Sequence, residues 1–511
     1  MGSPATMGLM RDLLICNANI ITLDARRLRA TAMLVRGERI VAAGDRSEVE
    51  PLATDPDILD LHGQTVVPGF IDSHVHFTWT GIRAFTLDLS AALSSDQALD
   101  LLQQRVARSA PGKLILAQGL EVAAGPKGAD LDRIAPANPV LLQGSTGHFA
   151  VANSLMLQRL DLRPGAPGLS AEQWLVGAAN TRAAWRVPAE FAAEIGWERV
   201  FGGAADDALR VGITTLHALE GEDRADDSAV LALQRLAPEL PIRIVVYCQT
   251  TDVDAALRLG LPRIGGCIWI DGDFAPHTAA LKQPYADEPA TCGCLYFDDA
   301  TVEAFVETAH RAGLQIALHC VGDAAVAQVL RAYRRALQLS PRADHRHRIE
   351  HFEVYDAELL REARALGVHV AIQPPFDGYF GGIEVNARFL GPERAQRADP
   401  IRTFVEHSIP IGGGSDCPVT PLGPLYGMHC AVNHSNPAER ITPLQALELF
   451  TINNARLAFE EADKGTIKSG KLADLTVLRD DPLEVAPERI KDIDVTMTIV
   501  GGHVRWTKEN L

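Results

Sequence analysis

The fold is decided by one short stretch of sequence, Val66-Val67-Pro68-Gly69-Phe70-Ile71-Asp72-Ser73-His74-Val75-His76. Its apolar residues are typical of a buried strand, and two histidines stand two residues apart where that strand ends. Because side chains alternate between the two faces of a strand, both imidazoles point to the same side. We therefore predict that His74 and His76 bind the same divalent cation.

Three later apolar runs also end in residues that can bind a metal. They carry His319 at the end of 314–320, His351 at the end of 347–351 and Asp416 at the end of 409–416. The carboxyl ends of parallel barrel strands meet at one rim, where the active sites of such barrels form. We predict that these three residues lie beside the first two histidines.

The number of apolar runs indicates the fold class. Eight runs of strand length are found at 65–76, 213–219, 242–248, 267–271, 314–320, 347–351, 368–373 and 409–416. Most of them are followed by a helical pattern, and eight such units predict an α/β fold, a (β/α)8 TIM-type barrel.

Both ends of the chain instead alternate short β-branched runs with turns. We predict that residues 8–65 and 465–511 form one small β-sandwich domain. Residues 474–478 and 495–500 are expected strands, and Gly501-Gly502 is an expected hairpin turn before 503–506. The barrel domain then spans residues 66–464.

The alternation of strand and helix patterns expected of a barrel is interrupted from about residue 82 to residue 205. Extra strands are expected at 113–118 and 140–143, among alanine-rich helices. We interpret this region as an inserted subdomain over the mouth of the barrel.

Composition restricts the partners of the protein. The formal net charge is −17 over 511 residues, which argues against nucleic acid or an anionic membrane surface as a partner. No apolar run reaches the roughly 18 residues that a membrane span needs. Eight cysteines are scattered through the chain without a secretory signal, so we expect a cytoplasmic protein. Exposed sheet edges make a homodimer plausible.

The five predicted ligands indicate hydrolytic metal chemistry. Four histidines and one aspartate suit zinc, in one or two ions, ahead of iron or manganese. A metal lowers the pKa of bound water, and Asp416 can take the proton from that water and pass it to a leaving group. Asp416 and, beside it, His351 are the catalytic candidates.

The chain resembles the amidohydrolase superfamily, and within it the YtcJ-like branch, the amidohydrolase 3 family that includes N-substituted formamide deformylases. The motifs that carry the resemblance beyond the metal ligands are Gly147-His148-Phe149-Ala150-Val151-Ala152-Asn153-Ser154, Thr451-Ile452-Asn453-Asn454-Ala455 and Gly470-Lys471-Leu472-Ala473-Asp474-Leu475. The resemblance implies that a metal-activated water cleaves an amide or related C–N bond of a small molecule. It also implies that Asp416 is the general base and acid, and that His148 faces the substrate.

The chain departs from the family at two positions. Where relatives often have a lysine on the fourth strand that can bridge two metals, this chain has Cys267. A thiolate can bind zinc, but a buried free cysteine can also be a small hydrophobic residue. The site therefore holds either two metals bridged by sulfur or one metal. Trp269 and Asp271 alternate with Cys267 and are candidates for substrate binding.

The second departure is Gly119-Leu120-Glu121, where relatives often have Gly-Trp-Asp. Glu121 is a candidate for orienting a polar group of the substrate, with a solvated surface carboxylate as the alternative.

Two other functions stay open from the sequence. One is a barrel that binds a small molecule without catalysis, and the other is a deaminase or lactonase on the same scaffold. Away from the predicted site, the charged run 342–348, with His345 and His347, is expected to be a solvated loop.

Overall fold

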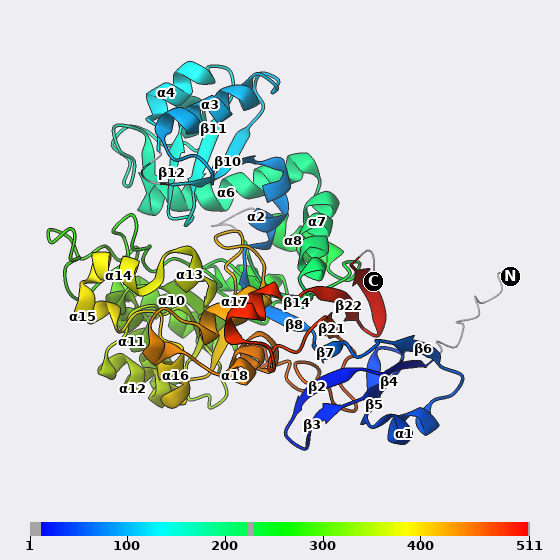
Figure 1. Cartoon of the computed structure of the whole chain (residues 1–511). Helices are drawn as coiled ribbons and strands as arrows, with labels where there is room; N and C mark the ends of the chain where they lie inside the picture. The colour runs from blue at the N-terminus through cyan, green and yellow to red at the C-terminus, as the bar shows by residue number, and fades with distance from the viewer. Residues whose placement is uncertain (1–11, 122, 124, 222–227, 509–511) are drawn as a thin grey trace.

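The centre of the molecule is a parallel eight-stranded barrel (Figure 1). The computed structural model describes residues 12–121, 123, 125–221 and 228–508. The barrel strands follow one another in chain order: β8 (Phe70–Val75), β14 (Ile213–Glu220), β15 (Arg243–Cys248), β16 (Arg263–Ile264), β17 (Gln315–Cys320), β18 (Arg348–His351), β19 (His369–Ile372) and β20 (Ile411–Gly413). The predicted (β/α)8 barrel is confirmed.

The barrel closes between its first and last strands. Val75 forms a parallel bridge with Cys417, and the amide of His76 donates to the Cys417 carbonyl at 2.9 Å. Below this point the buried side chain of Asn454 donates to the carbonyls of Ile71 and Gly413, one on each strand. These bonds hold the end of β8 against the segment that carries Asp416.

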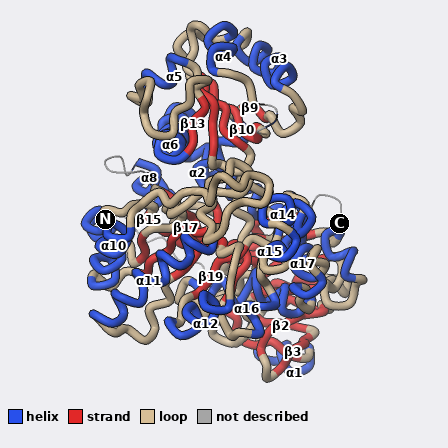
Figure 2. Tube along the Cα trace, turned by 90° about the vertical axis from the view of Figure 1, so that its left-hand side faces the viewer, coloured by secondary structure: helices blue, strands red, loops and turns tan. Residues whose placement is uncertain are grey.

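Helices surround the barrel in the order expected for βα units (Figures 1 and 2). The outer helices are α7 (Trp197–Arg210), α8 (Ser228–Leu236), α9 (Val253–Arg258), α10 (Asp299–Arg311), α11 (Asp323–Leu339), α12 (Ala357–Leu366) and α16 (Arg402–Glu406). In α11 the buried residues Val326, Val329, Leu330 and Tyr333 recur every three or four positions, which places one apolar face on the strands. Helices α17 (Pro424–Val432), α18 (Pro443–Glu448) and α19 (Asn454–Leu457) follow β20.

The first predicted strand, 65–76, is divided in the structure. Its first part is β7 (Thr65–Pro68), which pairs with strands from both ends of the chain rather than with the barrel. The division falls at Gly69, where a Cβ would lie 2.3 Å from Thr214 Oγ1. Only glycine allows this close approach, and β8 begins at the next residue.

The fourth strand also differs from its prediction at 267–271. The regular strand is the two-residue β16, and it ends at Gly265 and Gly266, whose φ angles are 95° and 65°. A Cβ on Gly265 would lie 2.1 Å from the Ala317 carbonyl oxygen. Beyond the two glycines the chain returns to the barrel through hydrogen bonds between residues 268–270 and His319.

Segments from both ends of the chain form a pair of sheets beside the barrel (Figure 1). One sheet contains β5 (Arg39–Gly44), β4 (Ala32–Arg36), β1 (Leu13–Cys16) and β6 (Asp57–Asp60). The other contains β23 (His503–Thr507), β22 (Val495–Val500), β21 (Leu475–Leu478), β7, β2 (Asn19–Asp24) and β3 (Arg27–Ala30). Apolar side chains from both sheets, such as Met33 and Val477, share one core. This is the predicted sandwich; residues 8–11 and 509–511 of its expected range lie outside the described residues.

The insert forms a separate layer above the barrel mouth (Figures 1 and 2). Its sheet contains β13 (Trp174–Val176), β12 (Phe149–Ala152), β11 (Val140–Gly144), β10 (Ile115–Leu120) and β9 (Leu87–Asp88). Helices α3 (Ser95–Val106), α4 (Gly128–Ile134), α5 (Ser154–Arg159) and α6 (Gly177–Ile195) complete it. The two strands expected here, 113–118 and 140–143, correspond to β10 and β11. The exact domain limits given by the sequence stay predictions.

The run 342–348 is not the solvated loop expected from its charge. His345 and His347 are both buried, and Arg348 is fully buried inside the barrel. The expectation rested on the charged residues of this segment. In the structure α10 and β17 contact it through His310 and Ile316, which both bond to His347. In the part of the chain that the structure describes, no helix is long and apolar enough to cross a lipid bilayer.

Candidate metal centre and substrate cavity

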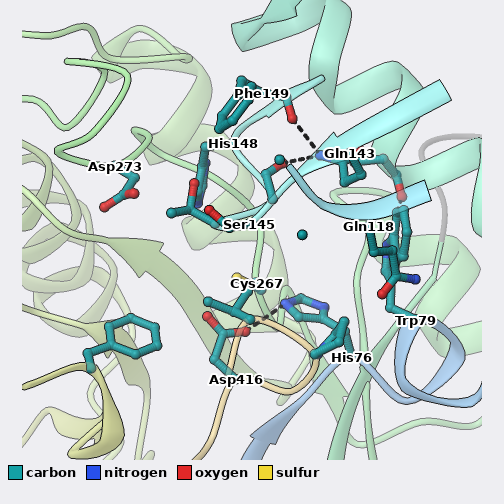
Figure 3. A pocket seen from close by; sticks show the side chains of 18 of the residues that line it. His76, Trp79, Gln118, Gln143, Ser145, His148, Phe149, Cys267, Asp273 and Asp416 are labelled. Carbon is teal, nitrogen blue, oxygen red and sulfur yellow. Dashed lines mark hydrogen bonds and ion pairs between the residues drawn. The ribbon is translucent and has the colours of Figure 1, made fainter. Parts of the chain in front are cut away.

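The two histidines of β8 meet Asp416 at the rim of the barrel. His74 Nε2 lies 3.3 Å and His76 Nε2 lies 3.2 Å from Asp416 Oδ1. The amide of Asp416 donates to the His74 carbonyl at 2.8 Å, so the barrel closure itself fixes this arrangement. His76 and Asp416 form the floor of the cavity in Figure 3.

Cys267 lies next to the two later histidines. Its Sγ is 3.6 Å from His319 Nδ1 and 4.0 Å from His351 Nε2. Three sets of side chains have ligand atoms that all lie within 4.8 Å of one another: His74, His76 and Cys267; Cys267, His319 and His351; and His74, His351 and Asp416. The structure thus brings all six sequence-predicted metal ligands together, with Cys267 shared by two of the sets.

The donor atoms of this cluster fit a metal ion. His74 Nε2 and Asp416 Oδ1 are buried, and neither has a hydrogen-bond partner among the described residues. A buried polar atom without a partner costs about 1–3 kcal/mol, and a cation bound between these two atoms would satisfy both. Imidazole, thiolate and carboxylate are also the ligand types that zinc accepts.

The cluster carries opposite charges at short range. Burial opposes ionisation of His76, but its contacts with Asp416 and Cys267 raise its pKa to about 10. Burial likewise opposes ionisation of Cys267, but the charges of His319 and His74 hold its pKa well below the usual range. The thiolate, which is the form that binds metals, is therefore favoured.

Three of the four histidines are oriented by a hydrogen bond on their other ring nitrogen. His74 Nδ1 donates to Glu350 at 2.8 Å, and His351 Nδ1 donates to the side-chain oxygen of Gln373 at 2.7 Å. His319 Nε2 donates to the Gly272 carbonyl at 3.2 Å. Such bonds fix the tautomer and the direction of a ligating imidazole. Sequence reasoning assigned no role to Glu350 or Gln373, although each lies on a predicted strand.

Two of the cluster residues have a strained backbone. His351 has a φ of 73° and Asp416 a φ of 57°, in the left-handed region that residues other than glycine seldom adopt. Strain of this kind costs about 1–3 kcal/mol and is concentrated at functional sites.

Asp271 does not lie in the position expected of a substrate-binding residue. Its carboxylate is fully buried and accepts from the amides of Ala280, Val321 and Gly322 at 2.8–3.0 Å. It is not among the described residues that line the cavity. We conclude that Asp271 organises the loops behind His319. Trp269, in contrast, does line the cavity.

A cavity of about 850 Å³ opens above the cluster. The insert forms its roof with His148, Gln143, Ser145 and Gln118, which face the metal-binding residues across the cavity (Figure 3). The His148 ring lies 4.9 Å from that of His319 and 4.5 Å from that of Trp269. Its Nδ1 is buried and has no hydrogen-bond partner among the described residues.

The remaining walls are largely aromatic. Trp79, Trp185, Phe274, Phe376, Tyr379, Phe380 and Phe389 all line the cavity. Trp185 comes from α6 of the insert, and its ring lies 6.2 Å from that of Trp269. Glu121 lies at the rim and is exposed. No sequence pattern pointed to these aromatic residues, because they come from helices and loops whose positions depend on the whole fold.

The sequence and the fold are similar to those of known hydrolases. The model of the amidohydrolase family matches residues 57–505. An N-substituted formamide deformylase from Arthrobacter pascens is 28% identical over 98% of this chain and 99% of its own length. Bacillus subtilis YtcJ, an amidohydrolase by name, is 27% identical over 94% of this chain and 96% of its own. The crystal structure of an uncharacterized metal-dependent hydrolase from Pyrococcus furiosus is 26% identical, covers 93% of this chain and 100% of its own, and has a TM-score of 0.74.

Proposed function

This chain belongs to the amidohydrolase family, and from that premise we propose that it is a metal-dependent hydrolase that cleaves an amide or related C–N bond of a small molecule. This chain is similar to an N-substituted formamide deformylase and to a metal-dependent hydrolase of known structure, and both similarities support the assignment. The observation that carries it is a pair of buried atoms, His74 Nε2 and Asp416 Oδ1, that have no hydrogen-bond partner among the described residues and lie 3.3 Å apart, next to the cavity that Asp416 lines.

The residues proposed to hold the metal are His74, His76, His319, His351, Asp416 and Cys267. Zinc suits this set of nitrogen, sulfur and oxygen donors better than iron or manganese. Because Cys267 belongs to two of the three sets, its thiolate would contribute to holding the metal, whether one or two ions bind. When bound, the metal supplies a Lewis acid that lowers the pKa of water toward neutrality.

Asp416 is the proposed proton carrier. Its carboxylate takes a proton from the attacking water, and the water oxygen forms the new bond to the carbonyl carbon. The C–N bond then breaks, and Asp416 returns the proton to the leaving nitrogen, which gives a carboxylic acid and an amine. The pKa of Asp416 lies well below its usual range: burial raises it, but the His74 and His76 contacts outweigh burial, so the carboxylate is ionised.

Three residues above the metal centre are proposed to position the substrate. His148 Nδ1 offers the carbonyl group a hydrogen-bonding partner, and Trp269 packs against the His148 ring. Glu121 at the rim is the third candidate, for a polar group that extends out of the cavity. His351 completes the arrangement as a metal ligand at the reacting centre.

The test combines metal content with turnover on a panel of amides, lactams, lactones and amino-substituted rings. Metal-replete protein should hydrolyse at least one amide class, and a chelator should abolish this activity. Asp416→Asn should retain metal while turnover falls by at least about a hundredfold. Full turnover in that variant would contradict the mechanism. Acid release from lactones alone, or ammonia release from rings alone, would favour a lactonase or a deaminase, and binding without any turnover would favour an inactive barrel.

Two further proposals concern the cellular location and the oligomeric state of the protein. We propose a cytoplasmic location, supported by the eight cysteines, which are scattered through the chain. A homodimer stays a prediction, and sedimentation measurements on the purified protein would test it.

A further inference from the structure

We propose that Arg348 is a positioning residue for the metal centre, because it holds His74 at two points: through the carboxylate of Glu350 and through the backbone carbonyl of Ser73. This inference rests on the proposed function, since it concerns how the chain would hold the proposed metal. Arg348 lies on β18, the sixth strand of the barrel, whereas His74 lies on β8, the first.

Arg348 and Glu350 form an ion pair inside the barrel. They stand two residues apart on β18, so both side chains leave the strand on the same face. That face is turned to the interior, because the two side chains meet residues of β8 and β14 there. Both residues are fully buried. Branched apolar side chains ordinarily fill the interior of such barrels, so a buried ion pair at this place requires a specific explanation.

The guanidinium of Arg348 binds both oxygens of the Glu350 carboxylate. Its Nε donates to Oε1 at 2.9 Å, and its Nη2 donates to Oε2 at 2.7 Å. Two bonds from one planar group fix the plane of the carboxylate as well as its position. Glu350 Oε2 is also the oxygen that accepts from His74 Nδ1 at 2.8 Å. Arg348 therefore fixes the acceptor that orients the His74 ring.

The second contact of Arg348 is with the backbone of β8. Its Nη2 also donates to the Ser73 carbonyl at 2.9 Å, and this carbonyl belongs to the peptide unit that joins Ser73 to His74. Its Nη1 donates to His217 Nδ1 at 3.1 Å, on the neighbouring strand β14, and this bond fixes the arginine itself. One guanidinium thus holds both the ring and the backbone of His74.

Stability alone is a weak explanation for this ion pair. Removing two charges from water opposes folding, and a buried ion pair often contributes no more to stability than apolar side chains of similar volume. The support that it gives to His74 also differs in kind from that of another ligand. His351 is oriented by the uncharged side-chain amide of Gln373, whereas His74 is oriented by a carboxylate. A carboxylate partner fixes a ligating imidazole and increases its basicity, so this pair would strengthen the bond of His74 to the metal.

The experiment measures zinc affinity by competition with a chromophoric chelator, a quantity that does not depend on turnover. Arg348→Lys keeps a positive charge beside Glu350, but an ammonium group cannot reproduce the planar pair of bonds to the carboxylate. We expect the zinc affinity of this variant to fall at least about tenfold.

Arg263→Lys is the matched control. The Cζ atoms of Arg263 and Arg348 lie over the same ring, that of Tyr247, at 5.6 Å and 4.5 Å from its centroid. Arg263, however, donates to the Ala458 carbonyl instead of to Glu350. The control should bind zinc as tightly as the wild type, and an equal loss of affinity in both lysine variants would overturn the inference.

A double variant separates positioning from folding. Arg348→Met alone leaves the Glu350 carboxylate buried without its cation and should lower the midpoint of denaturant unfolding. Arg348→Met combined with Glu350→Leu removes both charges and should restore that midpoint, but zinc affinity should stay at least about tenfold below that of the wild type.

The outcomes for the inference and for the proposed function are distinct. Wild-type zinc affinity in Arg348→Lys, or in the double variant, would overturn the inference and leave the metal site intact. Wild-type protein that binds no zinc would overturn the proposed metal site and the inference with it. If zinc binds and no amide is hydrolysed, the hydrolase function is wrong, and the zinc affinities of the variants still decide the role of Arg348.

Discussion

Two groups of buried histidines at opposite ends of the barrel differ in how their nitrogen atoms are used. The mouth cluster, at the carboxyl ends of the strands, contains His74, His76, His319 and His351. The basal cluster, at the amino ends of β17 and β18, contains His310, His345 and His347. Both are close-packed, with ring centroids 4.5–5.4 Å apart in the pairs that touch.

In the basal cluster every ring nitrogen has a partner. His347 Nδ1 accepts from the amide of Ile316 at 3.1 Å, so its Nε2 donates to His310 Nδ1 at 2.9 Å. His310 Nε2 in turn donates to the Ser340 carbonyl, and His345 donates to the Leu366 carbonyl and accepts from the amide of His347. This chain of bonds assigns one neutral tautomer to each ring.

In the mouth cluster the outer nitrogens of His74, His319 and His351 are hydrogen-bonded, and the inner nitrogens face a thiol and a carboxylate. The comparison teaches that burial and histidine neighbours alone do not mark a ligand, because the two clusters share both and differ in whether their ring nitrogens are all used in hydrogen bonds. The next predictions test this distinction in order of the expected effect.

Substitution in the mouth cluster should abolish metal binding and activity. His319→Asn removes a ligand nitrogen, and we expect turnover to become undetectable and the metal content per chain to fall. Elemental analysis and amide hydrolysis measure the two effects. His62→Asn, at a side chain that is 81% exposed, is the control. Full metal content and turnover in His319→Asn would break the comparison.

Substitution in the basal cluster should instead cost stability. His347→Ala leaves the amide of Ile316 and the Nδ1 atom of His310 without their partners, so the free energy of unfolding should fall by about 2–3 kcal/mol. Denaturant unfolding measures this change, and the metal content of the folded variant should equal that of the wild type. Loss of metal at unchanged stability would show that the basal cluster is itself a metal site.

The outer hydrogen bonds of the mouth cluster should tune metal affinity. Gln373→Leu removes the acceptor for His351 Nδ1, and we expect metal affinity to fall about 10–100-fold. Gln373→Glu keeps an acceptor at that position and should restore most of the affinity. Competition with a chromophoric chelator measures both variants. Equal affinities for Leu and Glu would mean that the bond does not orient His351.

Acid should destabilise the protein through histidines near the basal end. Burial lowers the pKa of His369 to about 4, from an ordinary value near 6.5. The unfolded chain therefore binds a proton that the folded chain does not, and stability declines as the pH falls from about 6.5 toward about 4. His369→Gln should make the plot of unfolding free energy against pH less steep in this window. An unchanged slope would exclude His369 as a cause.

Sequence reasoning found the parts of the fold that depend on local periodicity. His74 and His76 were placed by the two-residue repeat of a strand, and His319, His351 and Asp416 by their positions at the ends of apolar runs. The strand at 267–271 was misplaced because a pair of glycines breaks the ladder just before it. His345 was expected in solvent because charge in its neighbours says nothing about which helix covers it.

The substrate side of the site was much less predictable. The partner of His351, Gln373, directly follows the next strand, β19. His148 was suggested only by family resemblance. Such residues come together from segments that are far apart in the chain. A single sequence does not show which of these segments meet in the folded protein.

The central claim is that the metal lies in the mouth cluster and that Cys267 belongs to its ligands. The most direct test is an anomalous difference map, recorded at the zinc absorption edge, from crystals of metal-replete protein. The account predicts strong density among His74, His76, His319, His351 and Asp416, with Cys267 Sγ about 2.3 Å from at least one ion. Metal density at the basal cluster, or a mouth cluster without density in fully loaded protein, would contradict it.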